Sequence, residues 1–162
     1  MKRILILPIL ILTLLVANPA FSGDLIKAVS AHRSGDYATA LREWKPLAEE
    51  GVPSAQNMLG HMYRLGQGVL QDYKTAVKLY ELAAEQGHAL AQSSLGVMYR
   101  KGWGVPQDYV RAHMWSNIAA SSGDSENASK NRDIFAKLMT PTQIAEAQKL
   151  ARECVAKNYK GC

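Results

Sequence analysis

The histidines, the acidic residues and the two cysteines are the side chains of this 162-residue sequence that could perform chemistry. The sequence has no GxSxG, HExxH or phosphate-loop motif, and no cysteine and histidine stand at a spacing familiar from nucleophilic catalysis. The four histidines, His32, His61, His88 and His113, fall at unrelated positions. Single scattered histidines are weak signals for a metal site. We therefore expect a protein that is not an enzyme and holds no metal or other cofactor.

Three aspartates recur at a fixed spacing that could be mistaken for an acid/base set. Asp36, Asp72 and Asp108 succeed one another at intervals of 36 residues. Equivalent positions in successive structural units do not bring two carboxylates together, as acid/base catalysis requires. An aspartate directly before a helix accepts hydrogen bonds from the free amides of the first turn. The spacing therefore predicts three helix N-caps.

The only two cysteines, Cys154 and Cys162, are eight positions apart. A continuous helix would separate them by about 12 Å, which is beyond the reach of a disulfide. A bond between them requires the helix to end, and Asn158 and Gly161 are suitable breakers. The pair lacks CxxC spacing and a neighbouring histidine, so we expect a structural disulfide rather than a redox or metal pair.

The first 22 residues have the pattern of a secretory signal peptide. Two basic residues precede an apolar run from Ile4 to Val16, and small residues stand at Ala20 and Ser22. This pattern predicts cleavage between Ser22 and Gly23. The alternative is an uncleaved membrane anchor, but the run is short for a span and no second hydrophobic stretch comes after it. We expect a periplasmic or secreted protein without a stable membrane span after cleavage.

Composition and charge argue against nucleic acid as a partner. The chain is 48% hydrophobic and 20% charged, as is ordinary for one globular domain. Signal cleavage would remove Lys2 and Arg3 and no acids, which lowers the net charge from +5 to +3. A charge this mild does not indicate nucleic-acid binding.

The strongest pattern in the sequence is an internal repeat. Residues 55–87 and 91–123 match without a gap at 17 of 33 positions. A weaker copy upstream aligns residues 35–40 with residues 71–76 at the same shift of 36. Such self-similarity is the signature of a stacked repeat architecture.

Each unit divides into two helices. Apolar residues recur at helical spacing on both sides of a glycine-containing loop, and Gly87 closes the second helix. Gly60 and Gly96 lie within the first helices, where glycine costs about 1 kcal/mol relative to alanine. Their repetition predicts a close crossing of the partner helix, with Tyr63 and Tyr99 filling the adjacent space.

The pattern AQ-x-x-LG-x-M-Y-x-x-G-x-GV-x-QDY-x-x-A, followed by AA-x-x-G, resembles the Sel-one-like repeat (SLR), a relative of the tetratricopeptide repeat. The resemblance implies an all-α fold, in which antiparallel helix pairs stack into a right-handed α-solenoid with a C-terminal helical cap. Two positions depart from it. Leu70 replaces the proline that is present as Pro106, and Ser116 stands where Tyr80 and Trp44 stand in the other units. We expect the last unit to pack differently against the C-terminal segment.

The predicted organisation has five parts. Residues 1–22 form the signal peptide and residues 23–51 a shortened helix pair, with its first helix over residues 24–34. Residues 52–87 and 88–123 form complete repeats. Residues 124–162 form two capping helices, over residues 126–138 and 141–158, with the disulfide. Thr140 and Pro141 give the start signal of the second capping helix. Trp103 stands between two glycines in a loop, where it is either a packing residue or an exposed contact residue.

The relation to tetratricopeptide repeats implies a binding surface on the concave face, which is built from the first helix of each pair. The positions that correspond to its contacts are Asn57, His61, Arg64, Ser93, Val97, Arg100 and Lys101. This set is polar to basic, which favours a partner peptide with carboxylates, although the same residues could equally form a solvated surface.

The implied function is a non-catalytic interaction module that binds a protein or peptide through this face. Two alternatives remain. The chain could be a periplasmic binder or hydrolase of cell-wall or beta-lactam-related ligands, or a structural unit that oligomerises through its exposed ends.

Overall fold

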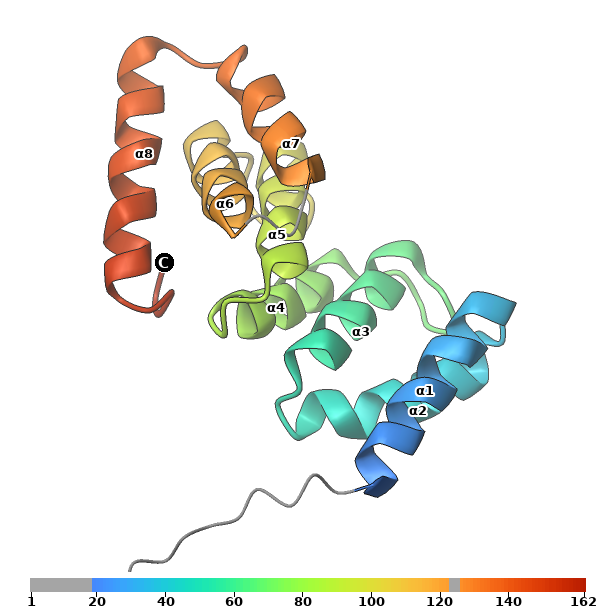
Figure 1. Cartoon of the computed structure of the whole chain (residues 1–162). Helices are drawn as coiled ribbons and strands as arrows, with labels where there is room; N and C mark the ends of the chain where they lie inside the picture. Colours follow the sequence, from blue (N-terminus) through green and yellow to red (C-terminus); the bar gives the residue numbers. More distant parts are fainter. Residues whose placement is uncertain (1–18, 123–125) are drawn as a thin grey trace, which may run out of the picture.

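The computed structural model describes residues 19–122 and 126–162 of the chain. All regular secondary structure in these two ranges is helical (Figure 1). The eight helices of the described chain are α1 (Pro19–Ser34), α2 (Tyr37–Glu49), α3 (Pro53–Leu65), α4 (Tyr73–Ala84), α5 (Ala89–Lys101), α6 (Tyr109–Ser121), α7 (Glu126–Ala136) and α8 (Pro141–Ala156).

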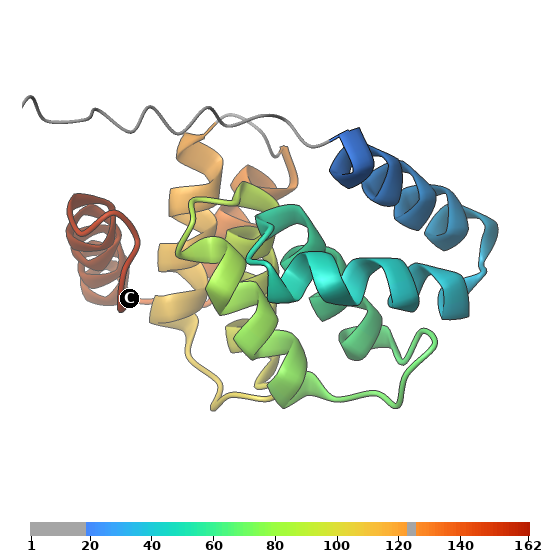
Figure 2. The ribbon, with the colours of Figure 1, turned by 90° about the horizontal axis from the view of Figure 1, so that it is seen from below.

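The helices pack in sequential pairs that stack along the molecule. Helices α1 and α2, α3 and α4, and α5 and α6 form the pairs, while α2 contacts α3 and α4 contacts α5. The pairs succeed one another along the molecule, with α1 and α2 at one end and α7 and α8 at the other (Figures 1 and 2). The fold is thus the predicted all-α solenoid, in which each pair buries its apolar faces against its neighbours.

The first helix begins earlier than the sequence predicted. It starts at Pro19 rather than at residue 24, because proline is well tolerated in the first turn of a helix. The predicted cleavage site between Ser22 and Gly23 therefore falls within the first turns of α1. Residues 1–18, the greater part of the predicted signal segment, lie outside the described residues.

The predicted caps set the boundaries of the repeat helices. The side chains of Asp36, Asp72 and Asp108 each accept a hydrogen bond from an amide two or three residues later, at 2.9 to 3.1 Å. Gly66 and Gly102 end α3 and α5 with φ of 70° and 67°, a left-handed conformation that glycine adopts without steric cost. These two devices explain why the duplicated sequence yields duplicated helix pairs.

The two helices of the first complete repeat cross closely at a glycine, as predicted. A Cβ on Gly60 would lie 3.0 Å from the ring of Tyr80 and 3.3 Å from the carbonyl oxygen of Ala76. The adjacent space is thus filled by Tyr80 of α4, and not by Tyr63 as the sequence suggested. Tyr80 lies one turn beyond Ala76 on the facing helix, whereas Tyr63 shares a helix with the glycine and points towards α2 and α4.

The helix crossing at the equivalent glycine of the second complete repeat is packed by different side chains. A Cβ on Gly96 would lie 2.5 Å from Ser116 Oγ, 3.0 Å from the Ala112 carbonyl oxygen and 3.6 Å from the ring of Phe135. Because Ser116 replaces the large residue of the other units, Phe135 of α7 reaches in and is only 1% exposed. This confirms the prediction that the last unit packs differently against the C-terminal segment.

The two capping helices do not form another repeat pair. Helices α7 and α8 both pack against α6, and α7 also contacts α5. Helix α7 thereby takes the place of the first helix of a further unit. Helix α8 begins at a capping box made by Thr140 and Gln143, and it covers a different side of α6 (Figure 1).

Candidate binding face on the first helices

The predicted contact residues differ in how far they reach the surface. Asn57 and Ser93 are buried, with exposures of 9% and 8%, so they offer little surface to a ligand. The other five lie on α3 and α5. Four of these are half-buried and Lys101 is exposed. We call this set, His61, Arg64, Val97, Arg100 and Lys101, the first-helix face.

Two arginines, one repeat apart, dominate the charge of this face. Neither Arg64 nor Arg100 forms an ion pair within the described part of the chain, whereas Arg42, Arg111 and Arg132 each do. A half-buried cation without a counter-charge has lost part of its hydration without electrostatic compensation. An anionic group of a ligand could therefore pair with Arg64 or Arg100 on the first-helix face.

Aromatic rings hold two of these cations in place. The guanidinium carbon of Arg100 lies 5.5 Å from the centre of the Phe135 ring, and Lys101 Nζ lies 5.8 Å from the centre of the Trp103 ring. A cation over a ring face is attracted by the negative π-surface. The ring limits the orientations of the Arg100 head group but supplies no hydrogen-bond acceptor, and Arg100 Nε is buried without a partner among the described residues.

Buried polar atoms without partners recur at one position of every repeat. Trp44 Nε1, Tyr80 Oη and Ser116 Oγ stand 36 residues apart, and none has a hydrogen-bond partner within residues 19–122 and 126–162. Burial raises the pKa of Tyr80, and the nearby side chains of Arg64 and Ser94 oppose this shift. The hydroxyl of Tyr80 therefore lies close to the first-helix face, beneath Arg64. Unsatisfied buried polar atoms are uncommon in proteins, so their recurrence at one repeat position is a property of the repeat packing.

The surroundings of His61 lower the pKa of its ring below the ordinary value. Burial lowers its pKa, and the positive charge of Arg64 and the ring of His32 lower it further, whereas a hydrogen bond with Gln67 raises it. The His32 and His61 rings lie 6.0 Å apart, centre to centre. In the described part of the chain, no three His, Cys, Asp or Glu side chains gather as metal ligands would. Arg64, Arg100 and Lys101 are the arginine and lysine residues of the face.

Other residues singled out in the sequence have architectural roles. Trp103 stacks on Tyr73 with ring centres 5.1 Å apart, so it is a packing residue that joins the loop after α5 to the start of α4. His88 caps α5 by accepting a hydrogen bond from the Ala91 amide at 3.3 Å. His113 is buried at 3% exposure, and burial lowers its pKa. The cap role of His88 was missed because histidine is not among the preferred N-cap residues.

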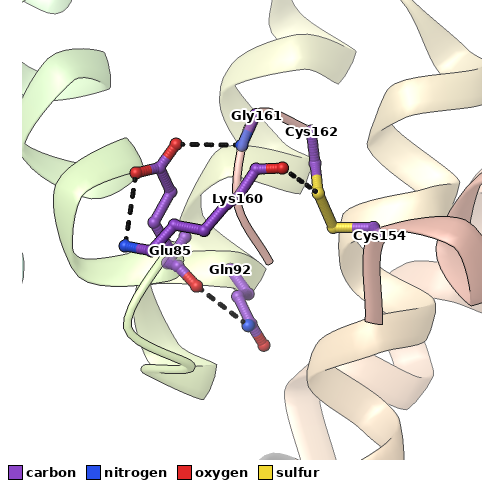
Figure 3. Close-up of a disulfide and its surroundings, with 7 residues drawn as sticks. Glu85, Gln92, Cys154, Lys160, Gly161 and Cys162 are labelled. Atoms are coloured by element: carbon purple, nitrogen blue, oxygen red, sulfur yellow. Dashed lines mark hydrogen bonds and ion pairs between the residues drawn. A yellow bond between two sulfur atoms is a disulfide. The ribbon is translucent and has the colours of Figure 1, made fainter. Parts of the chain in front are cut away.

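The C-terminal disulfide was anticipated, but the contacts of its tail were not. Cys154 and Cys162 are bonded, with Cα atoms 5.5 Å apart. The helix ends between them, and Asn158 and Gly161 both have positive φ, as does Tyr159. The bond draws the last residues back towards the end of α4 (Figure 3). No residue of the tail carries a sequence signal for that contact, since it joins segments about half the chain apart.

The stacked helix pairs define the class of protein as an α-solenoid repeat protein. A family model for the Sel1 repeat matches residues 53–88 and 89–124. The chain therefore carries two Sel1 repeats, each placed one residue later than the units predicted from the sequence. No helix of the described residues is both long and apolar enough to cross a membrane.

Two solved structures share this architecture. One is a protective antigen of uropathogenic Escherichia coli strains with an SLR fold, which is 27% identical, with a TM-score of 0.79 over 86% of this chain. The other is a Sel1 repeat protein from Oxalobacter formigenes, which is 31% identical, with a TM-score of 0.61 over 65% of this chain. The match spans 31% and 44% of these longer chains, respectively. A search of curated proteins found no match to the sequence.

Proposed function

We propose that this chain is an exported, non-catalytic module that binds an acidic segment of a partner protein through its first-helix face. Proteins with Sel1 repeats generally act as protein interaction modules. The observation that carries the proposal is the pair Arg64 and Arg100. They occupy equivalent positions one repeat apart, are half-buried, and have no carboxylate partner in the described chain.

The spacing of these arginines fits an extended ligand better than a small one. Repeated side chains on successive first helices offer repeated contacts along one direction, and an extended peptide presents its own groups at regular intervals. Carboxylates on such a peptide would supply the missing counter-charges, and bidentate pairing with a guanidinium adds geometric selectivity. The Tyr80 hydroxyl lies near Arg64 but is buried, so the arginines themselves are the groups that a ligand would contact.

Export is supported by the pattern of residues 1–22 and by the disulfide. Disulfides persist in oxidising compartments and are rare in the reducing cytosol. The periplasm or the extracellular space is therefore the place where we expect the partner.

The test is capture of partners from the periplasmic and culture fractions, followed by mass spectrometry. We compare the natural chain with the double variant Arg64→Glu/Arg100→Glu. The matched control is Lys74→Glu/Lys78→Glu, which makes the same change of charge at two exposed positions of α4. A partner recovered by the natural chain and the control, but reduced more than about tenfold with the arginine variant, supports the proposal. This loss corresponds to about 1.4 kcal/mol or more.

Equal recovery with both double variants would remove the first-helix face as the binding surface. Circular dichroism and urea unfolding of each variant establish that the helices are intact. The interaction with the recovered partner should also weaken as the salt concentration rises, because salt screens the attraction between partly exposed charged groups.

A further inference from the structure

The C-terminal tail of this chain is held against the end of α4. Gly161 donates its amide to Glu85 Oε1 at 3.2 Å, and Lys160 Nζ lies 3.7 Å from Glu85 Oε2 (Figure 3). The ring of Tyr159 lies over Gly87, so close that a Cβ there would be 3.2 Å from it. The disulfide to Cys154 holds the tail in this position. The tail therefore recognises the end of α4 through one carboxylate and one glycine.

The repeat places the same recognition elements 36 residues earlier. Glu49 and Gly51 at the end of α2 correspond to Glu85 and Gly87 at the end of α4. Gly51 has a φ of 88° and Gly87 a φ of 80°, so the two backbones turn alike. A Cβ on Gly87 would meet the ring of Tyr159, whereas a Cβ on Gly51 would meet no described atom within 4 Å. The upstream element is thus an uncovered copy of the tail-binding element.

The junctions between successive helix pairs are built in the same way at the two positions. Gln56 donates to the Ala48 carbonyl at 3.3 Å, and Gln92 donates to the Ala84 carbonyl at 3.2 Å. Each glutamine begins the next pair and ties it to the end of the preceding one. The backbone of the two junctions is therefore alike, whereas one neighbouring side chain differs, since Lys45 stands one turn before Glu49 and Glu81 stands one turn before Glu85.

The walls differ in how far they are covered. Leu82 on α4 is 50% exposed, whereas its counterpart Ile118 on α6 is 3% exposed beneath α8. The open groove between α2, α3 and α4 has a volume of about 440 Å³ and is lined by Lys45, Ala48, Glu49, Gln56, Leu59, Tyr63, Thr75, Leu79 and Leu82. It offers an apolar wall, with the carboxylate of Glu49 and the ammonium group of Lys45 one helical turn apart at one end. Glu49 has no ion pair in the described chain, unlike Glu85.

We propose that the groove between α2 and α4 binds a segment of a partner protein whose chemistry resembles this chain's own tail. The segment places an aromatic ring against Gly51, a lysine or arginine at Glu49, and an apolar side chain on Leu79 and Leu82. Glu49 is complementary to the single cation of such a segment, and the leucines are complementary to its apolar side chain. Lys45, one turn before Glu49 in the same groove, disfavours a segment with several adjacent cations. This surface differs from the first-helix face in both position and charge, so failure of one proposal would not contradict the other.

The test uses a synthetic peptide of residues 153–162, closed by its own disulfide, as the probe. It is titrated into the isotope-labelled full chain while the amide signals are followed by NMR. We expect saturable shifts of Glu49, Gly51 and Leu82 at peptide concentrations up to about 5 mM, the range of weak peptide affinities. The variant Glu49→Lys/Leu82→Lys should weaken binding by about tenfold or more.

The control variant is Glu50→Lys/Leu90→Lys. Glu50 is the exposed neighbour of Glu49, and Leu90 is 53% exposed on α5, close to the 50% of Leu82, but neither lines the groove. The control should bind the peptide as the natural chain does, and so should Arg64→Glu/Arg100→Glu.

Three results would overturn the proposal. The first is the absence of shifts, or equal affinity in the groove variant and its control. The second is a set of shifts confined to Glu85 and Gly87, which would mean that the peptide only displaces the tail. The third is a dimer in sedimentation that the groove variant abolishes, which would assign the groove to a second copy of this chain.

Discussion

Replacement of Gly96 by alanine tests the close helix crossing in the second repeat. The added Cβ would lie 2.5 Å from Ser116 Oγ and 3.0 Å from the Ala112 carbonyl oxygen. Alanine is favoured over glycine within a helix by about 1 kcal/mol. Overpacking in a well-packed core costs about 1–3 kcal/mol, and the carbonyl of Ala112, as part of α6, cannot move aside alone. The difference between these two contributions predicts that Gly96→Ala lowers the free energy of unfolding by up to about 2 kcal/mol.

The partner substitution isolates the source of this cost. Ser116 Oγ is buried without a hydrogen-bond partner in the described chain, so Ser116→Ala should leave the free energy of unfolding nearly unchanged or raise it slightly. It removes the atom closest to the added Cβ and leaves the contact with Ala112. Gly96→Ala should then cost less in the Ser116→Ala background, with a coupling free energy of about 1 kcal/mol.

Urea unfolding of the four proteins in this cycle measures the coupling from the midpoints at constant slope. Ser121→Ala serves as the control background, because Ser121 lies on the same helix but its hydroxyl bonds to the Ile118 carbonyl at 2.7 Å. No coupling with Gly96→Ala is expected there. The reasoning is refuted if Gly96→Ala stabilises the protein, or if its cost is the same in the Ser116→Ala background as in the natural chain.

Two further predictions concern the C-terminal tail and a helix cap. Replacing Cys154 and Cys162 together by serine should lower the free energy of unfolding by about 2–3 kcal/mol on the chain-entropy model; an unchanged urea midpoint in the oxidised protein would contradict this. The hydrogen bond from the Thr75 hydroxyl is the main cause of the lowered pKa of Asp72. The ionised carboxylate therefore stabilises the fold above its unfolded pKa, and this contribution is lost as the pH falls through the lowered value. Asp72→Ala should lower the urea midpoint at neutral pH, and its deficit should shrink below pH 3.8, the ordinary pKa of the group; a deficit that stays constant into acid would argue against the cap.

The helix pairs were predictable because their signals are local. Asp36, Asp72 and Asp108 cap the turns directly after them, and Gly66 and Gly102 end helices at their own positions. A cap or a left-handed residue acts within one turn, so spacing along the sequence is enough to find it. The repeat strengthened each assignment, since the same signals occur in the same order twice.

The proposed binding face was predictable only in outline. Its positions came from the resemblance to tetratricopeptide repeats, and burial depends on what packs beside each of them. Asn57 and Ser93 are buried in the structure, whereas Lys101, from the same predicted set, is exposed. The ring over Arg100 belongs to Phe135, which is 35 positions away on a helix outside the repeats. Sequence spacing carries no information about such a contact.

The sequence by itself determined the helical repeat, its caps and its glycine crossings. Helix caps depend on hydrogen bonds within one turn, and helical periodicity depends on the spacing of residues along the chain, so both can be recognised in the sequence. Tertiary structure decided which groups were left without partners. It brought Phe135 into the place that Ser116 leaves open, and it left Arg64 and Arg100 without carboxylates in the described chain. The tertiary structure also places the C-terminal tail against Glu85, whereas no described segment covers Glu49. Packing between segments that are distant in the sequence decides which of two equivalent surfaces is covered.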